Sequence, residues 1–299
     1  MDWLELSCRV DVEAVEAVSE CFSRIAHGGV AVEPDLVPGA DDGVTLGSVA
    51  TVRAYIPIDA ESDSKSRRLD EALAHLYAIW PIGELVQTVV AEEDWANAWK
   101  AHFTTVRVGQ RIVIRPTWIP YEPTPFDVVV SLDPGAAFGT GLHPTTNRCL
   151  QVLETVIDPG DRVLDVGTGS GILAIASMRL GAESVTAVDV DEIAVSVARA
   201  NVQVNGLSER ITVQTGTVET PDYGLTYDVV VANIIARVII EIAPDLCRRM
   251  APAGTLVTAG IIADRADDVA KRLSSLGLQW ERFVDGDWVT FVCRKTPVS

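Results

Sequence analysis

A glycine-rich turn, Asp165 to Gly171 (DVGTGSG), holds the residues best suited to bind a ligand. A short apolar run precedes it, and apolar residues at helical spacing follow it as far as Gly181, which is a suitable helix C-cap. The pattern predicts a buried strand, a tight turn and a helix. Because Gly167, Gly169 and Gly171 remove every Cβ from one side of the turn, a flat polar ligand could lie against backbone N–H groups at the start of the helix.

The spacing of these glycines distinguishes between classes of ligand. A dinucleotide fingerprint needs a third glycine three residues after the second, and Ile172 occupies that position. A phosphate-binding Walker loop ends in Gly-Lys-Ser or Gly-Lys-Thr, which this turn lacks. The remaining pattern, Asp-x-Gly-x-Gly-x-Gly, resembles the turn of class I S-adenosylmethionine-dependent methyltransferases. A tight turn that binds no ligand stays open as an alternative.

Polar residues end two further apolar runs. Asp189 ends a predicted strand 22 residues after Gly167, where a carboxylate can accept hydrogen bonds from ribose hydroxyls. Asp191 is expected to cap the helix that follows. Asn233 ends a fourth predicted strand, at the edge where open α/β sheets bind ligands. A turn or capping role is the alternative for Asn233.

A second unusual stretch runs from Asp133 to Thr146 (DPGAAFGTGLHPTT). Its glycines, prolines, hydroxyls and imidazole do not build a core, so the stretch indicates a shaped loop. Thr145 or Thr146 suits the N-cap of a helix predicted over 147–157. The functional alternative makes one of the two threonines a ligand contact above the glycine turn.

The order of predicted elements indicates two domains. Residues 1–91 read as β-α-β-β-α-β, which predicts a small α+β ferredoxin-like domain. Residues 92–118 read as a linker, with Trp95, Trp99 and Phe103 at four-residue spacing on a helix, followed by a strand. Residues 119–299 begin with a buried strand over 126–132 and continue as an α/β domain of five parallel strands. The turn Asp285-Gly-Asp predicts a terminal antiparallel hairpin.

Composition limits the class of protein. The 299 residues carry a net charge of −18, and 48% of them are hydrophobic. Residues 1–94 hold 19 acidic and 6 basic side chains, a net of −13, against −5 for the remainder. A negatively charged surface repels the phosphates of nucleic acid and attracts a basic protein partner. The alternative is that the acidic residues only keep the protein soluble. Five scattered cysteines without a Cys-x-x-Cys pair indicate neither a disulfide framework nor a zinc site.

Three segments together resemble the PrmA family of methyltransferases, which modify large-subunit ribosomal protein eleven. They are residues 133–146, 165–171 and 230–236 (VVANIIA). Residues 93–100 (EDWANAWK) and 115–118 (RPTW) also resemble that family, so the resemblance covers nearly the whole chain. The chain departs from the family pattern at Leu142, where threonine is usual, and at Ile235, where leucine is usual.

The resemblance implies a class I methyltransferase domain with S-adenosylmethionine as cofactor, bound by Thr146, Gly167, Asp189 and Asn233. Gly169, in the same glycine turn, is a further candidate for the cofactor site. The resemblance also implies an amino-terminal domain that recognises the substrate, and methylation of lysine and N-terminal amines. A lysine amine has a pKa of about 10.4 and must lose a proton before it reacts. We hypothesise that an apolar site lowers this pKa and that Asn233 is the catalytic residue, its carbonyl aligning the amine.

Several alternatives accompany this hypothesis. Water is expected to take the proton, with His143 as a weaker candidate base. The acceptor could instead be a lysine of another basic protein or a small molecule, and a non-catalytic cofactor-binding or assembly protein is a third possibility. The acidic first residues are unlike a signal peptide, and no long uncharged apolar run occurs. We therefore expect a cytoplasmic monomer that binds no metal, contacts no membrane and does not contact nucleic acid directly.

Overall fold

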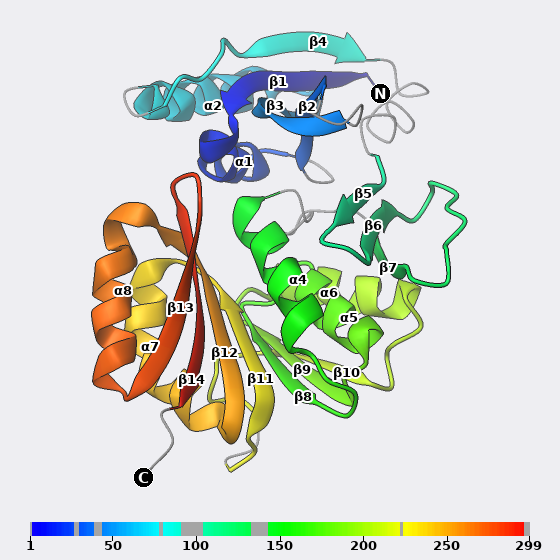
Figure 1. Cartoon of the computed structure of the whole chain (residues 1–299). Helices are drawn as coiled ribbons and strands as arrows, with labels where there is room; N and C mark the ends of the chain where they lie inside the picture. Colours follow the sequence, from blue (N-terminus) through cyan, green and yellow to red (C-terminus); the bar gives the residue numbers. More distant parts are fainter. Residues whose placement is uncertain are drawn as a thin grey trace. The chain divides into compact units, whose positions relative to one another are not determined.

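The computed structural model describes residues 2–26, 30–38, 44–77, 80–90, 104–132, 143–221 and 224–295 (Figure 1). The described residues form two compact units, one ending at Thr104 and the other beginning at Thr105. The predicted helix with Trp95 and Trp99 lies outside the described residues, as do residues 133–142 of the loop predicted from Asp133 to Thr146. Within the described ranges, no helix is long and apolar enough to span a membrane.

The first unit is a four-stranded antiparallel sheet in the order β2-β3-β1-β4, packed on two helices. Its elements are β1 (Trp3–Asp11), the short 3-10 helix η1 (Val12–Ala14), α1 (Val15–Ser23), β2 (Val30–Pro38), β3 (Val44–Pro57), α2 (Ser62–Leu76) and β4 (Val86–Val90). Alternate residues of β1, Leu6, Cys8 and Val10, enter the core with Phe22 of α1 and Leu73 of α2. This is the β-α-β-β-α-β arrangement of the ferredoxin-like fold that the sequence predicts.

The second unit is built on a seven-stranded sheet in the order β10-β9-β8-β11-β12-β14-β13. Its elements are α4 (Pro144–Val156), β8 (Arg162–Val166), α5 (Ile172–Leu180), β9 (Ser184–Asp189), α6 (Glu192–Val204), β10 (Ile211–Thr215), β11 (Tyr227–Asn233), α7 (Ala236–Arg249), β12 (Met250–Ile262), α8 (Ala263–Ser275), β13 (Leu278–Asp285) and β14 (Trp288–Lys295). The first five strands in this order are parallel. β14 runs antiparallel to both β12 and β13, so β13 has the same direction as the first five strands. The predicted class I methyltransferase sheet with its terminal hairpin is confirmed.

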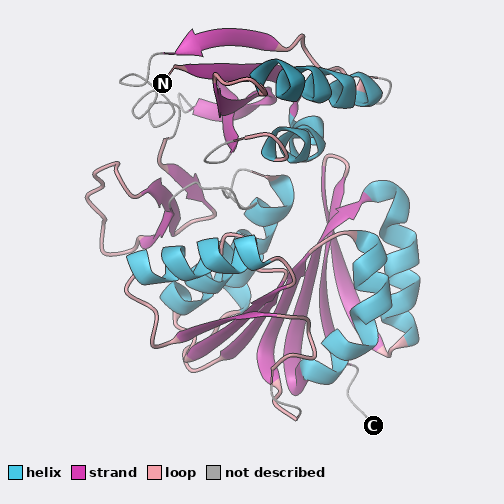
Figure 2. Cartoon of the chain, turned by 180° about the vertical axis from the view of Figure 1, so that it is seen from behind, coloured by secondary structure: helices cyan, strands magenta, loops and turns pink. Residues whose placement is uncertain are grey.

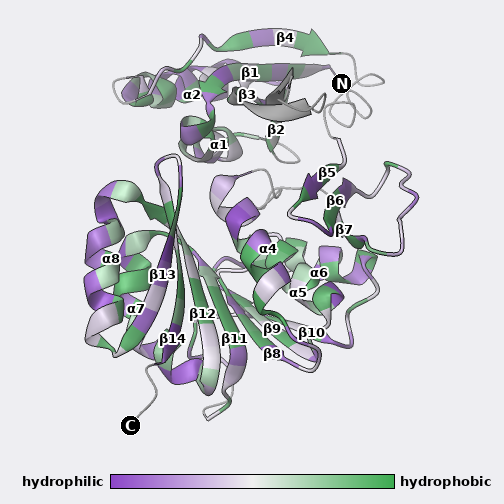
Figure 3. Cartoon of the chain, in the orientation of Figure 1, coloured by the Kyte–Doolittle hydropathy of each residue, from purple (hydrophilic) through white to green (hydrophobic). Residues whose placement is uncertain are grey.

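Both faces of this sheet are covered by helices, as Figure 2 shows from behind. Along β11, Val229 and Val231 enter the core shared with α4, α5 and α6, whereas Val230 and Ala232 enter the core shared with α7 and α8. A strand buried on both faces needs a continuous apolar run, and β11 has one from Val229 to Ala232. Figure 3 shows hydrophobic colour along this strand. By the same alternation, Asn233 at the end of β11 belongs to the face that carries α4.

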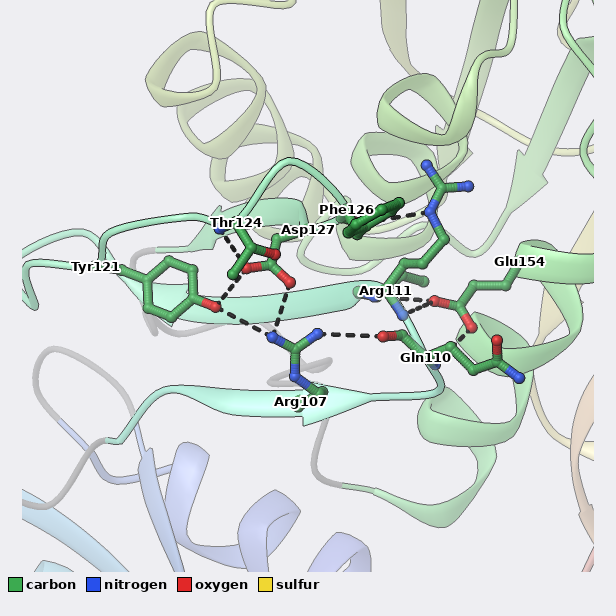
Figure 4. Close-up of polar contacts among 9 residues, drawn as sticks. Arg107, Gln110, Arg111, Tyr121, Thr124, Phe126, Asp127 and Glu154 are labelled. Atoms are coloured by element: carbon green, nitrogen blue, oxygen red, sulfur yellow. Dashed lines mark hydrogen bonds and ion pairs between the residues drawn. The ribbon is translucent and has the colours of Figure 1, made fainter.

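A small three-stranded sheet of β5 (Val106–Val108), β6 (Ile112–Pro116) and β7 (Val128–Leu132) also belongs to the second unit. The strand predicted from Phe126 begins two residues later, and Phe126 is 78% exposed. The cause is the carboxylate of Asp127, which accepts hydrogen bonds from the Thr124 N–H (2.8 Å), Tyr121 (2.8 Å) and Arg107 (2.7 Å), as Figure 4 shows. These bonds hold residues 124–127 as a turn.

Helix α4 is tied to this small sheet by Glu154. The Glu154 carboxylate accepts backbone N–H groups from Gln110 (2.9 Å), Arg111 (2.6 Å) and Ile112 (2.9 Å) in the turn between β5 and β6 (Figure 4). Gly109 in that turn has φ of 63°, and a Cβ there would collide with the carboxylate. The carboxyl-terminal half of α4 is therefore firmly anchored.

Candidate active site

The site lies at the carboxyl edge of the parallel strands, between β8 and β11. From β8 the chain proceeds outward to β9 and β10, and then crosses back to β11 and β12 on the other side. Ligands of open α/β sheets bind where the strand order reverses in this way. Here the reversal brings the glycine turn after β8 beside Asn233 at the end of β11.

The glycine turn has the predicted conformation but a different pattern of hydrogen bonds. Gly167, Gly169 and Gly171 have φ of 74°, 55° and 80°, which residues with a Cβ rarely adopt. The N–H groups of Gly167 and Thr168 donate to the Val188 carbonyl at 2.8 and 3.1 Å, and that of Gly171 donates to the Thr168 carbonyl at 2.9 Å. These three N–H groups are therefore engaged within the protein, and the predicted contact of a ligand with backbone N–H groups at the start of the helix stays a prediction. The glycines instead allow close packing, since a Cβ on Gly167 would collide with Ile234.

Asp189 connects the ends of β9 and β8. Its carboxylate accepts the Gly169 N–H at 2.9 Å and the Asp191 N–H at 3.0 Å. An ionised carboxylate has about four positions for hydrogen-bond donors, so two positions remain for ribose hydroxyls. Asp191 caps α6 by accepting the Ile193 N–H at 2.9 Å, as predicted.

Thr146 and Asn233 meet although 87 residues separate them. The side-chain amide of Asn233 donates from Nδ2 to Oγ1 of Thr146 at 3.2 Å. Thr146 is buried in the first turn of α4, and Asn233 is half-buried. Because the amide nitrogen is engaged by Thr146, the orientation of the Asn233 carbonyl is determined by α4.

Helix α4 begins at Pro144, three residues before the predicted start. Its N-cap is His143, whose Nδ1 accepts the Thr145 N–H at 3.3 Å, so the prediction that a threonine caps this helix is wrong. Proline suits the first helical position because no hydrogen bond is lost there. Burial lowers the pKa of His143 to about 4, so its imidazole is neutral near pH 7 and a weak base. This argues against His143 as the general base.

Gly260 is a site residue that the sequence analysis missed. It has φ of 79°, and a Cβ there would lie 2.6 Å from the backbone oxygen of Ile234 and 3.0 Å from its nitrogen. Ile234 is the residue after Asn233. Its side chain packs against Gly167, and its backbone packs against Gly260. The signal in the sequence is a glycine inside a strand pattern, which often marks a bulge or a close backbone approach. The β12–β14 register does shift between Thr258 and Ile261.

Asp165 lies beneath the glycine turn and is fully buried. Its Oδ2 accepts a hydrogen bond from the Thr168 hydroxyl at 2.6 Å. Burial raises the pKa of this carboxyl from 3.8 to about 7; the hydrogen bond from Thr168 opposes the rise, and the charge of Asp189 adds to it. Because the buried carboxyl group binds a proton at a higher pH than it does in the unfolded chain, the stability of the folded protein depends on pH.

The folded protein holds a proton on Asp165 between about pH 4 and pH 7, whereas the unfolded chain releases it. The free energy of unfolding should therefore fall with rising pH in this window, relative to that of an Asp165→Asn variant that cannot titrate. Between about pH 4 and pH 7, the difference in free energy of unfolding between wild type and Asp165→Asn should change by up to about 4 kcal/mol. Urea unfolding at several pH values measures it, and a difference independent of pH would contradict the assignment.

The structure thus brings all five predicted site residues to one sheet edge. Gly169 and Asp189 share a hydrogen bond, as do Thr146 and Asn233. Gly167 links the two pairs, because the residue after Asn233 packs on it.

Comparison with known proteins identifies the family. The family model described as ribosomal protein L11 methyltransferase (PrmA) matches residues 2–296. The ribosomal protein L11 methyltransferase of Chloroflexus aurantiacus is 44% identical over an alignment of 322 residues that covers 98% of each chain. That of Herpetosiphon aurantiacus is 41% identical over 319 residues, covering 99% of each chain. The crystal structure of a ribosomal protein L11 methylase from Lactobacillus delbrueckii subsp. bulgaricus superposes with a TM-score of 0.61 at 30% identity, covering 65% of this chain and 100% of that one. These matches confirm the resemblance, and the chain belongs to the ribosomal protein L11 methyltransferase (PrmA) family.

Proposed function

We propose that this protein transfers methyl groups from S-adenosylmethionine to amines of ribosomal protein L11, on lysine side chains and at the N-terminus. The observation that carries the proposal is the hydrogen bond from Asn233 to Thr146. It uses the amide nitrogen of Asn233 and leaves the carbonyl oxygen as an acceptor for an amine N–H. The two curated relatives, which are named for L11 methylation and match along their whole length, support the choice of substrate.

The residues of the sheet edge fit the cofactor. Asp189 keeps two acceptor positions for ribose hydroxyls, and the glycine turn presents no side chain at Gly169. Thr146 and Asn233 would complete the site from the opposite side. When bound, S-adenosylmethionine supplies a methyl group already activated on a sulfonium. The protein then has to hold the acceptor in line and exclude water.

The acceptor amine must be neutral to react. An amine with a pKa of about 10.4 in water carries a proton at pH 7. Apolar surroundings disfavour the charged form and lower this pKa. Ile234 and Ile235, next to Asn233, supply apolar surface, and Ile235 is 54% exposed. The Asn233 carbonyl would accept one amine N–H and so orient the nitrogen lone pair, while water takes the released proton.

The first unit is suited to bind a basic substrate protein. The net charge of −13 over residues 1–94 attracts a positively charged partner and raises its rate of encounter. We infer that this unit binds ribosomal protein L11 outside the site that performs methyl transfer.

The decisive experiment incubates the protein with isotope-labelled S-adenosylmethionine and purified L11, and identifies the modified amines by mass spectrometry. Label on L11 is expected, and L11 with chemically acetylated amines is the matched control that should stay unlabelled. Methylation of another basic protein in place of L11 would change the proposed acceptor. Calorimetry should detect binding of S-adenosylmethionine; binding of NAD alone would overturn the proposed cofactor.

A further inference from the structure

The end of the β13–β14 hairpin is bound to the first turns of α4. The Arg148 guanidinium donates to both carboxylate oxygens of Asp285, from Nε at 2.8 Å and from Nη2 at 2.5 Å. The same guanidinium lies over the ring of Phe283, 5.4 Å from its centroid. A bidentate, half-buried pair of this kind fixes orientation as well as distance.

Trp288 contacts the residue that caps α4. It is the first residue of β14 and pairs with Asp285 in β13 and Ile262 in β12. Its ring packs edge to face with His143, with the ring centroids 4.8 Å apart and the planes at 75°. Its indole N–H is buried and has no hydrogen-bond partner within the part of the chain that the structure describes. The ring contact with His143, rather than a hydrogen bond, is therefore the interaction that Trp288 supplies to α4.

These contacts lead directly to the site. His143 caps α4 through the Thr145 N–H, and Thr146 is the next residue along the helix. Thr146 in turn receives the amide of Asn233. Any shift of the His143 ring would move the first turn of α4, and with it the hydroxyl that orients Asn233.

We propose that Trp288 is a positioning residue for methyl transfer, which holds the first turn of α4 through His143 so that Thr146 keeps the Asn233 carbonyl directed at the acceptor amine. The far half of α4 is anchored separately by Glu154. Loss of Trp288 therefore acts on the first turn and leaves the rest of the helix in place. This inference rests on the proposed function, since it deepens the role given to Asn233.

The test compares Trp288→Leu with Trp288→Phe. Leucine removes the aromatic edge-to-face contact, and small misplacements of reacting groups lower rates steeply, so kcat for L11 methylation should fall by at least about tenfold. The KM for S-adenosylmethionine should change by less than about threefold, because Gly167 and Asp189 are untouched. Phenylalanine keeps an aromatic ring and should restore most of kcat.

Trp280→Leu is the matched control. Trp280 also packs edge to face, against Phe291 at 5.2 Å, and lies in the same hairpin opposite Cys293, far along β13 from Asp285. Its kcat should stay within about twofold of wild type. An unchanged kcat in Trp288→Leu, or an equal loss in Trp280→Leu, would overturn the inference.

A second measurement does not depend on activity. The side-chain amide signals of Asn233 in ¹⁵N NMR, assigned with Asn233→Ala, should shift in Trp288→Leu and keep their positions in Trp280→Leu. If Trp288→Leu does not fold, as judged by its melting curve, the same comparison is made with Trp288→Met, which also removes the aromatic ring. The Asn233 signals should shift in that variant, and wild-type positions would count against the inference. If wild-type protein leaves L11 unlabelled, the proposed function fails, while the NMR comparison still decides whether Trp288 positions Asn233.

Discussion

Replacement of Asn233 by alanine is expected to lower kcat for methylation of ribosomal protein L11 by about 100-fold, the usual effect of removing one preoriented polar group from an active site. The side-chain carbonyl of Asn233 is oriented because Thr146 engages the amide nitrogen at 3.2 Å. Alanine removes the acceptor that aligns the amine, but Asp189 and the glycine turn remain. The dissociation constant for S-adenosylmethionine should therefore rise by less than about tenfold. Single-turnover kinetics and calorimetry measure the two quantities.

Two substitutions of Thr146 provide the control for this prediction. Thr146→Ser keeps the hydroxyl that accepts the Asn233 amide, and its kcat should stay close to wild type. Thr146→Val keeps the shape of the buried side chain but removes the acceptor, so the Asn233 amide can rotate and kcat should fall. Turnover that survives Asn233→Ala unchanged would remove Asn233 from the mechanism.

Replacement of Gly260 by alanine is expected to lower the free energy of unfolding by about 3 kcal/mol, of which 1–2 kcal/mol come from the left-handed backbone and the rest from overpacking. The new Cβ would lie 2.6 Å from the Ile234 oxygen, 2.9 Å from its carbonyl carbon and 3.0 Å from its nitrogen. These are backbone atoms, so no side-chain rotation relieves the collision. Because Ile234 follows Asn233, kcat should fall as well. Urea unfolding and steady-state kinetics measure both effects.

Gly206→Ala separates the two causes. Gly206 has a similar φ of 68°, but a Cβ there meets nothing within 4 Å. Its free energy of unfolding should fall by only about 1 kcal/mol, the cost of placing alanine in a left-handed backbone conformation, and its kcat should stay unchanged. If Gly260→Ala and Gly206→Ala lose equal stability, Gly260 does not pack against Ile234 as described.

Most of the fold could be predicted from the sequence because its signals are local. The apolar run that ends at Asn233 predicts a strand, and the structure has β11 there, buried on both faces. Asp191 precedes a helix and caps it, and Gly181 ends α5 with φ of 126°. The local signals misplaced the start of α4, because a histidine acceptor replaces the expected threonine cap. They also extended β7 to Phe126, because hydrogen bonds to Asp127 from separate segments hold a turn there.

By itself, the sequence determined the family, the order of strands and helices, and which polar residues end the strands at one edge of the sheet. These properties depend on residue type and on spacing along the chain. Only the tertiary structure decided that Asn233 bonds to Thr146, that Gly260 and Gly167 enclose Ile234, and that Trp288 packs against His143. Each of these contacts joins residues distant in sequence. Such contacts form only when α4, the hairpin and the sheet edge pack together, so no local pattern records them.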